Sequence, residues 1–461
     1  MNTILIIGAG FSGTLIAARL LKLDTQKSLC VYLVNGSGLI ARGMAYGTQS
    51  LHHVLNVPAG NMSAFDEDPQ HFLRYAKRID PTIEAGSFVP RRMYGDYLEW
   101  LLSEAERTAR PNIELKRIYE QVTSIVEHDK KDTCSVSFEN KNVLIVNKII
   151  LALGHFPSQL LPIQDKEFYK SARYLHDPWD SARLDSIPAR SPVLLIGTGL
   201  TAIDVATSLL SRNQNRQITA VSRRGLVPQA HRAATGTLLG SGASFIWGDA
   251  GTVRSQLRGF RQFCENIEGQ RRDWRDGMAI LRPITSEIWL NYSDKERRRF
   301  IRHLQAFWDT HRHRLAPAVA ERFSSALASG VIRTIAGRIA SLEEHKDGVK
   351  IGIRPRGSEQ LNFLEKHFVI NCTGPCADPS RAKSVLVKQL LSDGYLRIDK
   401  LGLGIDVTPE CATISAHGKI SSSLFYIGPW LRATYWEATA VPDLRVMAKK
   451  MTSQLILDLA Y

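Results

Sequence analysis

The chain has 461 residues, of which 44% are hydrophobic and 23% charged, a composition typical of a globular protein with large cores rather than a disordered chain. Its 59 Lys and Arg residues exceed its 45 Asp and Glu residues, which favours anionic partners such as dinucleotides, acidic substrates or nucleic acid. No apolar run reaches the length of a membrane span, so we expect no membrane partner.

The six cysteines are scattered along the chain. Two of them, Cys30 and Cys134, lie in apolar runs of the kind that form strands. This distribution suits reduced, buried thiols better than a disulfide framework. We therefore expect a cytoplasmic protein.

The N-terminal residues predict a βαβ unit of the kind that binds dinucleotides. An apolar strand is followed by a glycine-containing loop, an apolar helix and a second apolar strand. The expected strands are Thr3 to Ile7 and Leu29 to Val34, and the expected helix is Thr14 to Leu23.

The loop of this unit reads Gly8-x-Gly10-x-x-Gly13, with Phe11 and Ser12 before the last glycine. Glycines at these positions let the backbone approach a pyrophosphate at the amino end of the helix. We predict that these five residues bind a dinucleotide. A tight turn without a ligand is the alternative.

Asn35 follows the second strand, at the position where an acidic residue commonly binds a ribose. An amide can still hydrogen-bond a ribose hydroxyl, although the charge-assisted bond is missing. Asn35 is therefore a predicted cofactor contact.

Weakly alternating strands follow from Val122 to Ile145, with a turn near Asp129 to Asp132, and an apolar strand then runs from Lys148 to Gly154. We interpret these segments as a β-meander and the closing strand of a first nucleotide-binding half. Val122 and Gly154 are predicted cofactor contacts.

An aromatic and imidazole cluster, Tyr174 to Trp179, is predicted to lie in a linker between two halves of the chain. Two interpretations are open for it. His176 and Trp179 either gate the movement of a cofactor, or Trp179 anchors the linker while His176 caps a turn.

The same βαβ unit recurs near the middle of the chain, so the sequence predicts two nucleotide-binding halves. The second half also has its own meander and an apolar closing strand that ends at glycine. The expected elements are the strands Pro192 to Ile196 and Gln217 to Ser222, the helix Ile203 to Ser211, the meander Ile339 to Leu364 and the closing strand His367 to Gly374.

Two arginines, Arg223 and Arg224, follow the second strand of this unit, and no acidic residue stands there. Two guanidinium groups beside a ribose 2′ position suit a 2′-phosphate, so we predict NADPH rather than NADH. Solvated arginines are the alternative. The other predicted cofactor contacts of this half are Gly197, Gly199, Leu200, Thr201, Ala202 and Gly374.

An Arg-rich segment from about Gly240 to Ser329 is expected to form a helical subdomain, with Ser293 and Glu296 as a capping box. Its aromatic side chains either line a lid over a substrate or form a core, and its arginines either attract an acidic substrate or are solvated. These residues are Trp274, Trp289, Phe300, Phe307 and Trp308, and Arg297, Arg298, Arg299, Arg302, Arg312 and Arg314.

Near the C-terminus, Leu424 to Gly428 predicts a strand, and Glu437 to Pro442 leads into a helix from about Asp443 to Ala460. The amino end of a helix stabilises anions, and a reduced flavin carries negative charge at its pyrimidine edge. Thr439 and Ala440 are therefore predicted flavin contacts, and Gly428 is a predicted cofactor contact.

Together with the two glycine loops, five further segments carry a resemblance that runs nearly end to end. The chain resembles the bacterial FAD/NAD(P)-binding proteins related to flavin-dependent N-hydroxylases and Baeyer–Villiger monooxygenases. The segments are Gly43-Met-Ala-Tyr-Gly-Thr48, Leu55-Asn-Val-Pro-Ala-Gly60, Phe88-Val-Pro-Arg-Arg-Met-Tyr-Gly-Asp-Tyr97, His311-Arg-His-Arg314 and Trp436-Glu-Ala-Thr-Ala-Val-Pro442.

The resemblance implies FAD between the first half and the C-terminal segment, with residues around Asn56 to Ala59, Val57 included, near the flavin ring, and NADPH in the second half. Relatives of the monooxygenase type reduce FAD with NADPH and form a flavin hydroperoxide that oxygenates a substrate. His176 falls roughly where such enzymes keep a linker motif. We take Asn56, His176 and Trp436 as candidate catalytic residues.

One departure from the resembled pattern concerns the flavin's ribityl chain. Many two-dinucleotide flavoenzymes have an Asp after the glycine corresponding to Gly428, and this chain has Pro429 there. The ribityl contact is therefore unassigned.

The predicted fold class is α/β, with two Rossmann-like dinucleotide-binding domains, each with a β-meander, and a helical insertion. Residues 1–185 and 367–461 are expected to form the FAD-binding domain. Residues 186–240 and 330–366 are expected to form the NADPH-binding domain, and residues 241–329 the insertion or lid.

Three functions are weighed. The predicted one is an FAD-containing, NADPH-dependent monooxygenase acting on a small molecule, with an acidic substrate as one option. The second is a reductase that passes electrons to a disulfide, quinone or protein, but Cys372 and Cys376 lack the C-x-x-C spacing. The third is a non-enzymatic flavin-binding redox sensor whose basic insertion binds nucleic acid; because no recognised nucleic-acid module is present, we expect no such partner.

Overall fold

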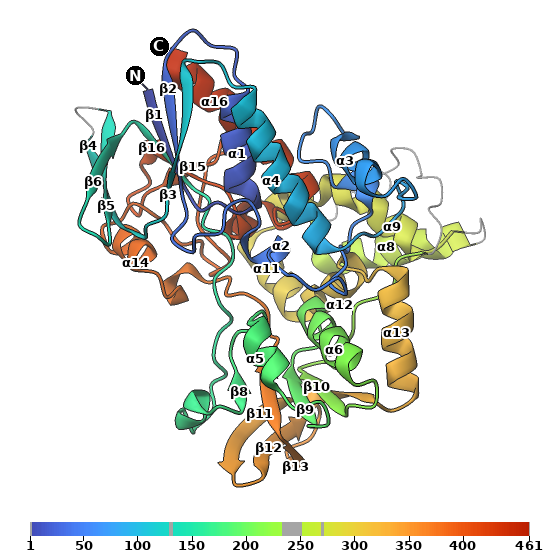
Figure 1. The fold of residues 1–461 in the computed structure, drawn as a ribbon. Coiled ribbons are helices and arrows are strands. Elements are labelled where there is room, and N and C mark those ends of the chain that lie inside the picture. Colours follow the sequence, from blue (N-terminus) through green and yellow to red (C-terminus); the bar gives the residue numbers. More distant parts are fainter. Residues whose placement is uncertain (1, 129–131, 233–250, 269–271, 461) are drawn as a thin grey trace. The chain divides into compact units, whose positions relative to one another are not determined.

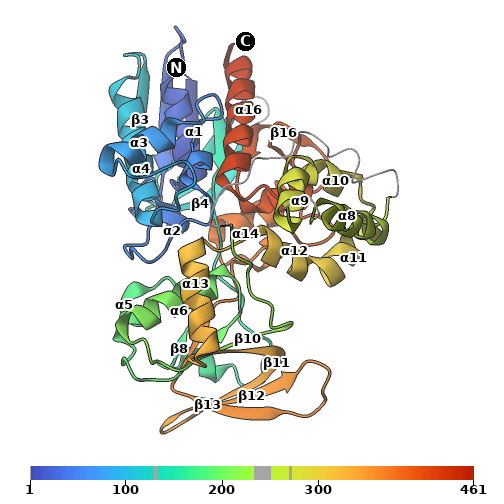
Figure 2. The same ribbon diagram turned by 90° about the vertical axis from the view of Figure 1, so that its right-hand side faces the viewer.

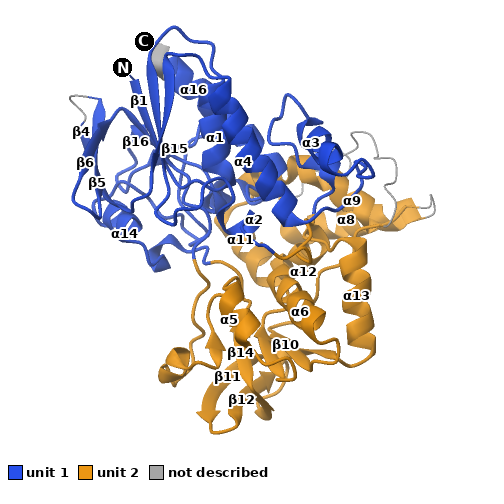
Figure 3. Cartoon of the chain, viewed as in Figure 1, with its two compact units in different colours: residues 1–49, 57–156, 376–461 blue, residues 50–56, 157–375 orange. Residues whose placement is uncertain are grey.

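The computed structural model describes residues 2–128, 132–232, 251–268 and 272–460, and it divides the chain into two compact units. Unit 1 comprises residues 1–49, 57–156 and 376–461, and unit 2 comprises residues 50–56 and 157–375 (Figure 3). Residues 129–131 of the expected turn and residues 241–250 and 269–271 of the expected insertion lie outside the described residues.

Unit 1 is built on a six-stranded sheet of order β15-β16-β7-β1-β2-β3. All neighbouring strands are parallel except β15 and β16, which are antiparallel. A second, antiparallel sheet of order β4-β5-β6 is the expected meander. The strands are β1 (Asn2–Ile7), β2 (Leu29–Val34), β3 (Ile113–Ile118), β4 (Val122–His128), β5 (Thr133–Phe138), β6 (Val143–Val146), β7 (Lys148–Leu151), β15 (Ala412–Ile414) and β16 (Ile420–Tyr426).

Helices α1, α4 and α16 lie side by side on one face of this sheet, and the β4-β5-β6 sheet lies on the other side (Figure 1). Strand β1 is apolar throughout its second half, and Ile4, Leu5 and Ile6 are fully buried between these layers. The helices of unit 1 are α1 (Phe11–Leu21), α2 (Gly43–Tyr46), η1 (Ala59–Asn61), α3 (His71–Ile79), α4 (Arg91–Arg107), η6 (Pro379–Arg381), α14 (Val385–Ser392), η7 (Pro429–Leu431), α15 (Arg432–Tyr435) and α16 (Val441–Ala460).

Unit 2 is built on a seven-stranded sheet of order β13-β12-β11-β10-β9-β14-β8. Strand β11 is shared: its first part pairs parallel with β10, and from Gly337 onward it pairs antiparallel with β12. The meander is therefore a continuation of the parallel sheet rather than a separate layer. The strands are β8 (Tyr174–Leu175), β9 (Val193–Ile196), β10 (Ile218–Ser222), β11 (Ile332–His345), β12 (Gly348–Pro355), β13 (Asn362–Lys366) and β14 (Phe368–Asn371).

The helical insertion is part of unit 2, and its helices α8 to α13 are labelled in Figure 2. Met278 and Leu281 are the buried centre of a small core of its own, on which Trp274 and Trp308 pack. The helices of unit 2 are η3 (Glu167–Lys170), α5 (Ser181–Ser186), α6 (Leu200–Arg212), α8 (Val253–Glu268), α9 (Trp274–Leu281), η4 (Arg282–Ile284), α10 (Thr285–Asn291), α11 (Asp294–Arg299), the π-helix η5 (Phe300–Leu304), α12 (Gln305–Arg312) and α13 (Pro317–Ala328).

The α/β fold class with two dinucleotide-binding halves is confirmed, and the strands and helices of both βαβ units lie where the sequence places them to within a few residues.

The capping box is only half formed: the Ser293 side chain accepts from the Glu296 amide, as expected. The Glu296 carboxylate instead accepts a 2.9 Å hydrogen bond from the Val253 amide, at the start of α8. The predicted helix after Ser293 is interrupted by the π-helix η5.

The units divide the chain at other positions than the expected domain limits. Residues 157–185 and 367–375, which the sequence assigns to the FAD-binding domain, lie in unit 2, as do residues 50–56. The segment Tyr174 to Trp179 is consequently not a free linker, because Tyr174 and Leu175 form the edge strand β8 and pair with β14.

Among the described residues, none of the helices combines the length and apolar character that crossing a bilayer requires.

Candidate functional site

The first glycine loop is shaped by contact between backbones. Gly8 follows β1 with a φ of +106°, and a Cβ atom there would overlap the carbonyl oxygen of Ala152, just after β7. A Cβ on Gly13 would overlap the carbonyl oxygen of Gly8. Only glycine fits both positions, because the turn from β1 into α1 brings the backbone into direct contact with these carbonyl oxygens and leaves no room for a side chain.

Helix α1 begins at Phe11, three residues earlier than predicted, because Gly10 adopts the extended N-cap conformation. Glycine has no side chain to cap the first amides, and the first turn contains no acidic residue. The free N–H groups and the positive end of the helix dipole therefore suit an external anion such as a pyrophosphate. Gly43 lies against this loop: a Cβ atom on Gly43 would be 3.0 Å from the Gly10 Cα, which gives a physical reason for the glycine that opens the Gly43 to Thr48 segment.

Asn35 uses its side-chain nitrogen within its own loop. The Nδ2 group donates to Ser37 Oγ at 2.9 Å and to the carbonyl oxygen of Leu39. The Oδ1 atom is then the group that would accept from a ribose hydroxyl. Beside this loop, a Cβ atom on Gly36 would be 2.7 Å from the side chain of Gln121, so the start of β4 with Val122 lies next to the end of β2.

Gly154 and Gly428, the other predicted glycines of unit 1, both have positive φ angles, +66° and +151°. Gly154 follows β7, and no atom lies within 4 Å of the place where its Cβ would be, among the described residues. Thr439 and Ala440 immediately precede α16, which begins at Val441, two residues before the predicted start. The Ala440 amide therefore lies at the positive end of this helix, where the flavin prediction needs a donor, whereas the Thr439 amide already donates to the Glu437 carbonyl oxygen at 2.8 Å.

Trp436 has a backbone conformation that side chains rarely adopt, with φ +58° and ψ −55°. It is 3% exposed, and the Arg432 guanidinium lies 4.0 Å from its ring centroid. Such a conformation in a bulky residue costs of order 1–3 kcal/mol and is typical of functional sites. The sequence singles out Trp436, but the strain is visible only in the structure.

An aromatic stack that the sequence did not predict lies beside Gly428. Phe156 and Trp430 are stacked with centroids 4.8 Å apart, and Tyr426 stacks on Trp430 at 5.6 Å. The Trp430 amide donates to Tyr426 Oη at 3.0 Å. Pro429, which starts η7, offers neither a charge nor an N–H, so it cannot replace the missing aspartate. The only sequence signal for this stack is the aromatic residue that follows Gly428-Pro429.

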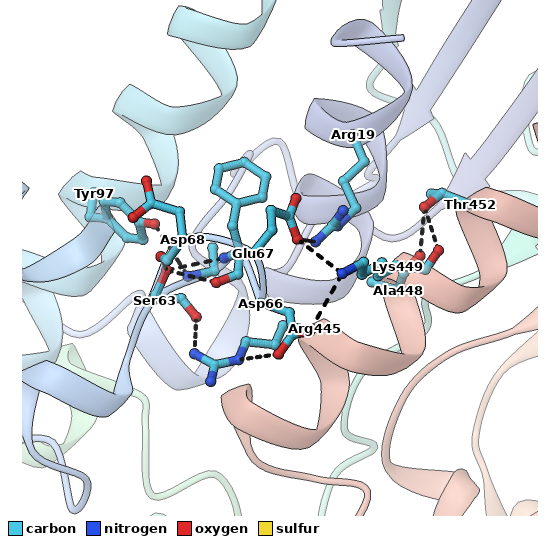
Figure 4. A network of polar contacts seen from close by, with 12 residues as sticks. Arg19, Ser63, Asp66, Glu67, Asp68, Tyr97, Arg445, Ala448, Lys449 and Thr452 are labelled. Atoms are coloured by element: carbon cyan, nitrogen blue, oxygen red, sulfur yellow. Dashed lines mark hydrogen bonds and ion pairs between the residues drawn. The ribbon is translucent and has the colours of Figure 1, made fainter. Parts of the chain in front are cut away.

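The loop that follows η1 is held between α1 and α16 by charged groups, as Figure 4 shows. Arg445 of α16 donates to the Ser63 carbonyl oxygen at 3.0 Å, and Arg19 of α1 contacts Glu67 at 2.8 Å. Lys449 lies 3.6 Å from Asp66. These contacts fix α16, and hence the position of its amino end, against α1.

The loop of unit 2 repeats the geometry of the first. Gly197 has a φ of +118°, and a Cβ there would overlap the carbonyl oxygen of Cys372, just after β14. Helix α6 begins at Leu200 with Gly199 as the extended N-cap, so its first amides again have no capping side chain. Ala202 takes the third glycine's place and is 2% exposed. Leu200 and Thr201 form the first turn, and Gly374 follows β14 with a φ of +85°.

The two arginines after β10 differ in their surroundings. Arg223 is exposed and makes no hydrogen bond or ion pair with any described residue. Arg224 donates to the Arg302 carbonyl oxygen at 3.0 Å and stacks 5.2 Å from the centroid of Phe307. The assignment of Arg223 and Arg224 to a 2′-phosphate stays a prediction. Of the two, Arg223 has the guanidinium without a partner among the described residues.

Asn56 belongs to the short segment 50–56 that is part of unit 2, whereas Val57 belongs to unit 1. The segment is anchored on unit 2 by His53, whose Nε2 lies 2.8 Å from Ser208 Oγ on α6. The Asn56 carbonyl oxygen accepts a 3.0 Å hydrogen bond from His231 Nε2. The sequence carries no signal for His53 or His231, because each contact joins residues more than 150 positions apart in the chain.

His176 lies beside Tyr174, with the Tyr174 hydroxyl 3.4 Å from the His176 Nδ1. The turn that follows is capped by Asp177, which accepts from the Trp179 amide at 2.9 Å. The Trp179 ring packs edge-on against His53 at 5.7 Å, as an anchor would. A catalytic role for His176 stays a prediction.

Comparisons with known proteins fit this geometry. Residues 5–156 match a family model described as FAD-NAD(P)-binding. A comparison with curated protein sequences gave no match.

Solved structures with the same fold include an N-hydroxylase and a monooxygenase. The ornithine N-hydroxylase of Kutzneria sp. 744, solved with reduced FAD, NADP⁺ and L-ornithine, has a TM-score of 0.65, 13% identity and 99% coverage of both chains. L-lysine 6-monooxygenase of Pseudomonas syringae has a TM-score of 0.66, 14% identity and the same coverage. Thioredoxin reductase of Lactococcus lactis has a TM-score of 0.56 and 12% identity, covering 100% of this chain and 99% of its own. The chain therefore has the fold of flavoproteins with two dinucleotide-binding domains.

Proposed function

We propose that the protein is an NADPH-dependent flavin monooxygenase that acts on a small molecule. The observation that carries the proposal is the repeated loop: in each unit a positive-φ glycine turns the chain into a helix whose N-cap is a glycine. Each unit thus offers backbone amides without a capping side chain at a helix start, which suits one dinucleotide per unit. The ornithine N-hydroxylase and the lysine monooxygenase among the solved structures support oxygenation as the reaction.

The residues of the chain fit FAD in unit 1 and NADPH in unit 2. In unit 1, the amides at the start of α1 would hold the pyrophosphate, and those at the start of α16 would stabilise negative charge on a reduced flavin. In unit 2, the start of α6 would hold the second pyrophosphate, and Arg223 the 2′-phosphate. When bound, FAD supplies the redox chemistry, since it accepts hydride from NADPH and passes electrons to dioxygen. The chain's own residues bind, orient and exclude water.

A dithiol reductase is less well supported, although thioredoxin reductase shares the fold. Three residues separate Cys372 from Cys376, where a C-x-x-C pair has two, and all six cysteines are free. Burial raises the pKa of the Cys372 thiol well above its usual range, which disfavours a reactive thiolate. The free thiols also support a place in the reducing cytoplasm.

The test is NADPH oxidation by the purified flavoprotein in air, with hydrogen peroxide measured at the same time. We expect slow oxidation without substrate and fast oxidation, with little peroxide, once a suitable amine or other small nucleophile is added. Rapid release of peroxide regardless of the added compound would support a reductase or oxidase. Failure of the apoprotein to take up FAD would contradict the monooxygenase as well as the reductase or oxidase.

Replacing Arg223 by alanine is expected to raise the KM for NADPH at least about 10-fold and to leave that for NADH unchanged. A charge-assisted hydrogen bond contributes roughly 1.5–3 kcal/mol, and only NADPH carries the phosphate that Arg223 would bind. The measurement is steady-state oxidation of both coenzymes. Arg322→Ala is the matched control, because Arg322 is an equally exposed arginine of unit 2. An equal loss with NADPH and NADH would refute the assignment of Arg223.

A further inference from the structure

The His311 to Arg314 segment, which the resemblance singles out but does not explain, lies beside the residues that follow β10. The Gln229 amide donates to the Thr310 carbonyl oxygen at 2.9 Å, and the Leu315 amide donates to the Gln229 carbonyl oxygen at 2.8 Å. These bonds bring the end of α12 next to His231 and to the start of α9. Four arginines meet here, and we call them the arginine cluster: Arg232, Arg275, Arg312 and Arg314.

Two carboxylates of the described residues lie near the cluster, and both are already engaged. Asp276 accepts from both terminal nitrogens of Arg232, at 3.0 and 2.6 Å. Asp273 accepts from Arg275 at 2.9 Å, contacts Arg232 at 2.8 Å and caps the amino end of α9. The arginine cluster therefore contains more positive charge than these acids can balance.

Arg314 is the cation left over. It is half-buried, it makes no hydrogen bond with any described residue, and its Nε is buried without an acceptor. Its guanidinium lies 5.9 Å from the centroid of Trp274, whose ring also stacks with Arg275 at 4.6 Å. Burial, and after it the charges of Arg312 and Arg275, lowers the pKa of Arg314 to about 10.

The other arginines of the insertion show that this arrangement is not the solvated face that the sequence also allows. Arg298 and Arg302 are exposed to water, as that interpretation predicts. Arg297 is paired with the Trp289 carbonyl oxygen at 3.1 Å. A half-buried guanidinium beside further cations is costly unless an anion compensates it, and the surplus of donors here matches what carboxylate and phosphate oxygens need.

We propose that Arg314, together with Arg275 above the Trp274 ring, forms a binding subsite for an anionic group, a carboxylate or a phosphate, on the small molecule that the enzyme oxidises. The proposal rests on the proposed function and deepens it, because it names the substrate class. His231 connects the subsite to Asn56 within unit 2 through its hydrogen bond to the Asn56 carbonyl oxygen. Burial lowers the pKa of His231 to about 4, so it is neutral near pH 7 and adds no further charge.

The test uses inorganic phosphate and succinate as probes, at constant ionic strength, with the FAD-loaded protein and its Arg314→Gln and Arg322→Gln variants. Thermal unfolding and tryptophan fluorescence report binding, and Trp274→Phe identifies which of the eight tryptophans responds. We expect both probes to raise the Tm of the wild type and of Arg322→Gln, and to bind Arg314→Gln at least about 10-fold more weakly. Without probe, Arg314→Gln should melt no lower than the wild type, because it removes an uncompensated charge.

Equal stabilisation of Arg314→Gln and the wild type by the probes would overturn the proposal. A second arm separates the two sources of the anion: the KM for NADPH should be unchanged in Arg314→Gln. A rise in that KM would assign Arg314 to the coenzyme's phosphate and would also overturn the proposal. Loss of FAD or of NADPH oxidation in the wild type would refute the proposed function, whereas binding of the probes would still be measurable.

Discussion

Gly199→Val is expected to leave the protein folded and FAD-bound while weakening NADPH at least about 100-fold, which corresponds to roughly 2.7 kcal/mol of binding free energy. Gly199 is in extended backbone that any residue adopts, and none of the described atoms lies within 4 Å of its would-be Cβ. The space around it is therefore open within the protein. A valine side chain would fill the place where the pyrophosphate must approach the backbone of the α6 start.

The measurement is the Kd for NADPH, by flavin reduction under anaerobic conditions, together with FAD content and Tm. Gly251→Val is the matched control, because Gly251 also lies in unit 2, is exposed and has none of the described atoms within 4 Å of its would-be Cβ. Unchanged NADPH binding in Gly199→Val would show that the second loop does not hold a dinucleotide.

Gly8→Ala is expected to lower the free energy of unfolding by roughly 2–4 kcal/mol and to yield protein with little FAD. Two costs add at this position. A φ of +106° is unfavourable for alanine, and the new methyl group overlaps the Ala152 carbonyl oxygen, which is itself backbone and cannot rotate away. The loop must therefore shift, and the amides of the α1 start shift with it.

Chemical denaturation and the flavin absorbance of the purified protein measure the two effects of Gly8→Ala. Gly38→Ala separates their causes, because Gly38 has a φ of +77° but no described atom within 4 Å of its would-be Cβ. This control should show the conformational cost alone, about 1 kcal/mol, with normal FAD content. Wild-type stability and FAD content in Gly8→Ala would contradict the role given to the first loop.

The duplicated βαβ unit was predictable from the sequence because its signals are local. Apolar runs bounded by glycines predict β1, α1 and β2 within three residues, and the same pattern predicts β9, α6 and β10. The error at α1 has a local cause too: Gly10 is an N-cap, so the helix starts at Phe11 rather than after the last glycine. The π-helix at Phe300–Leu304 has no such pattern and was missed.

The candidate site was only partly predictable. The glycine positions follow from spacing, but the use of Asn35 Nδ2 within its own loop, the strained backbone of Trp436 and the stack of Phe156 on Trp430 depend on neighbours distant in sequence. The placement of Asn56 in unit 2 depends on His231, far along the chain. Spacing carries no information about such partners.

By itself, then, the order of residues determined the fold class, the two glycine-lined helix starts and the basic end of β10, because each depends on residues within one turn or one strand. The tertiary structure decided where the units divide and which charges remain unpaired. Arg314 illustrates the reason, because the arginines of the insertion look alike in the sequence. Only the packing distinguishes Arg314: it removes water from this guanidinium, while the two nearby described carboxylates pair with other arginines.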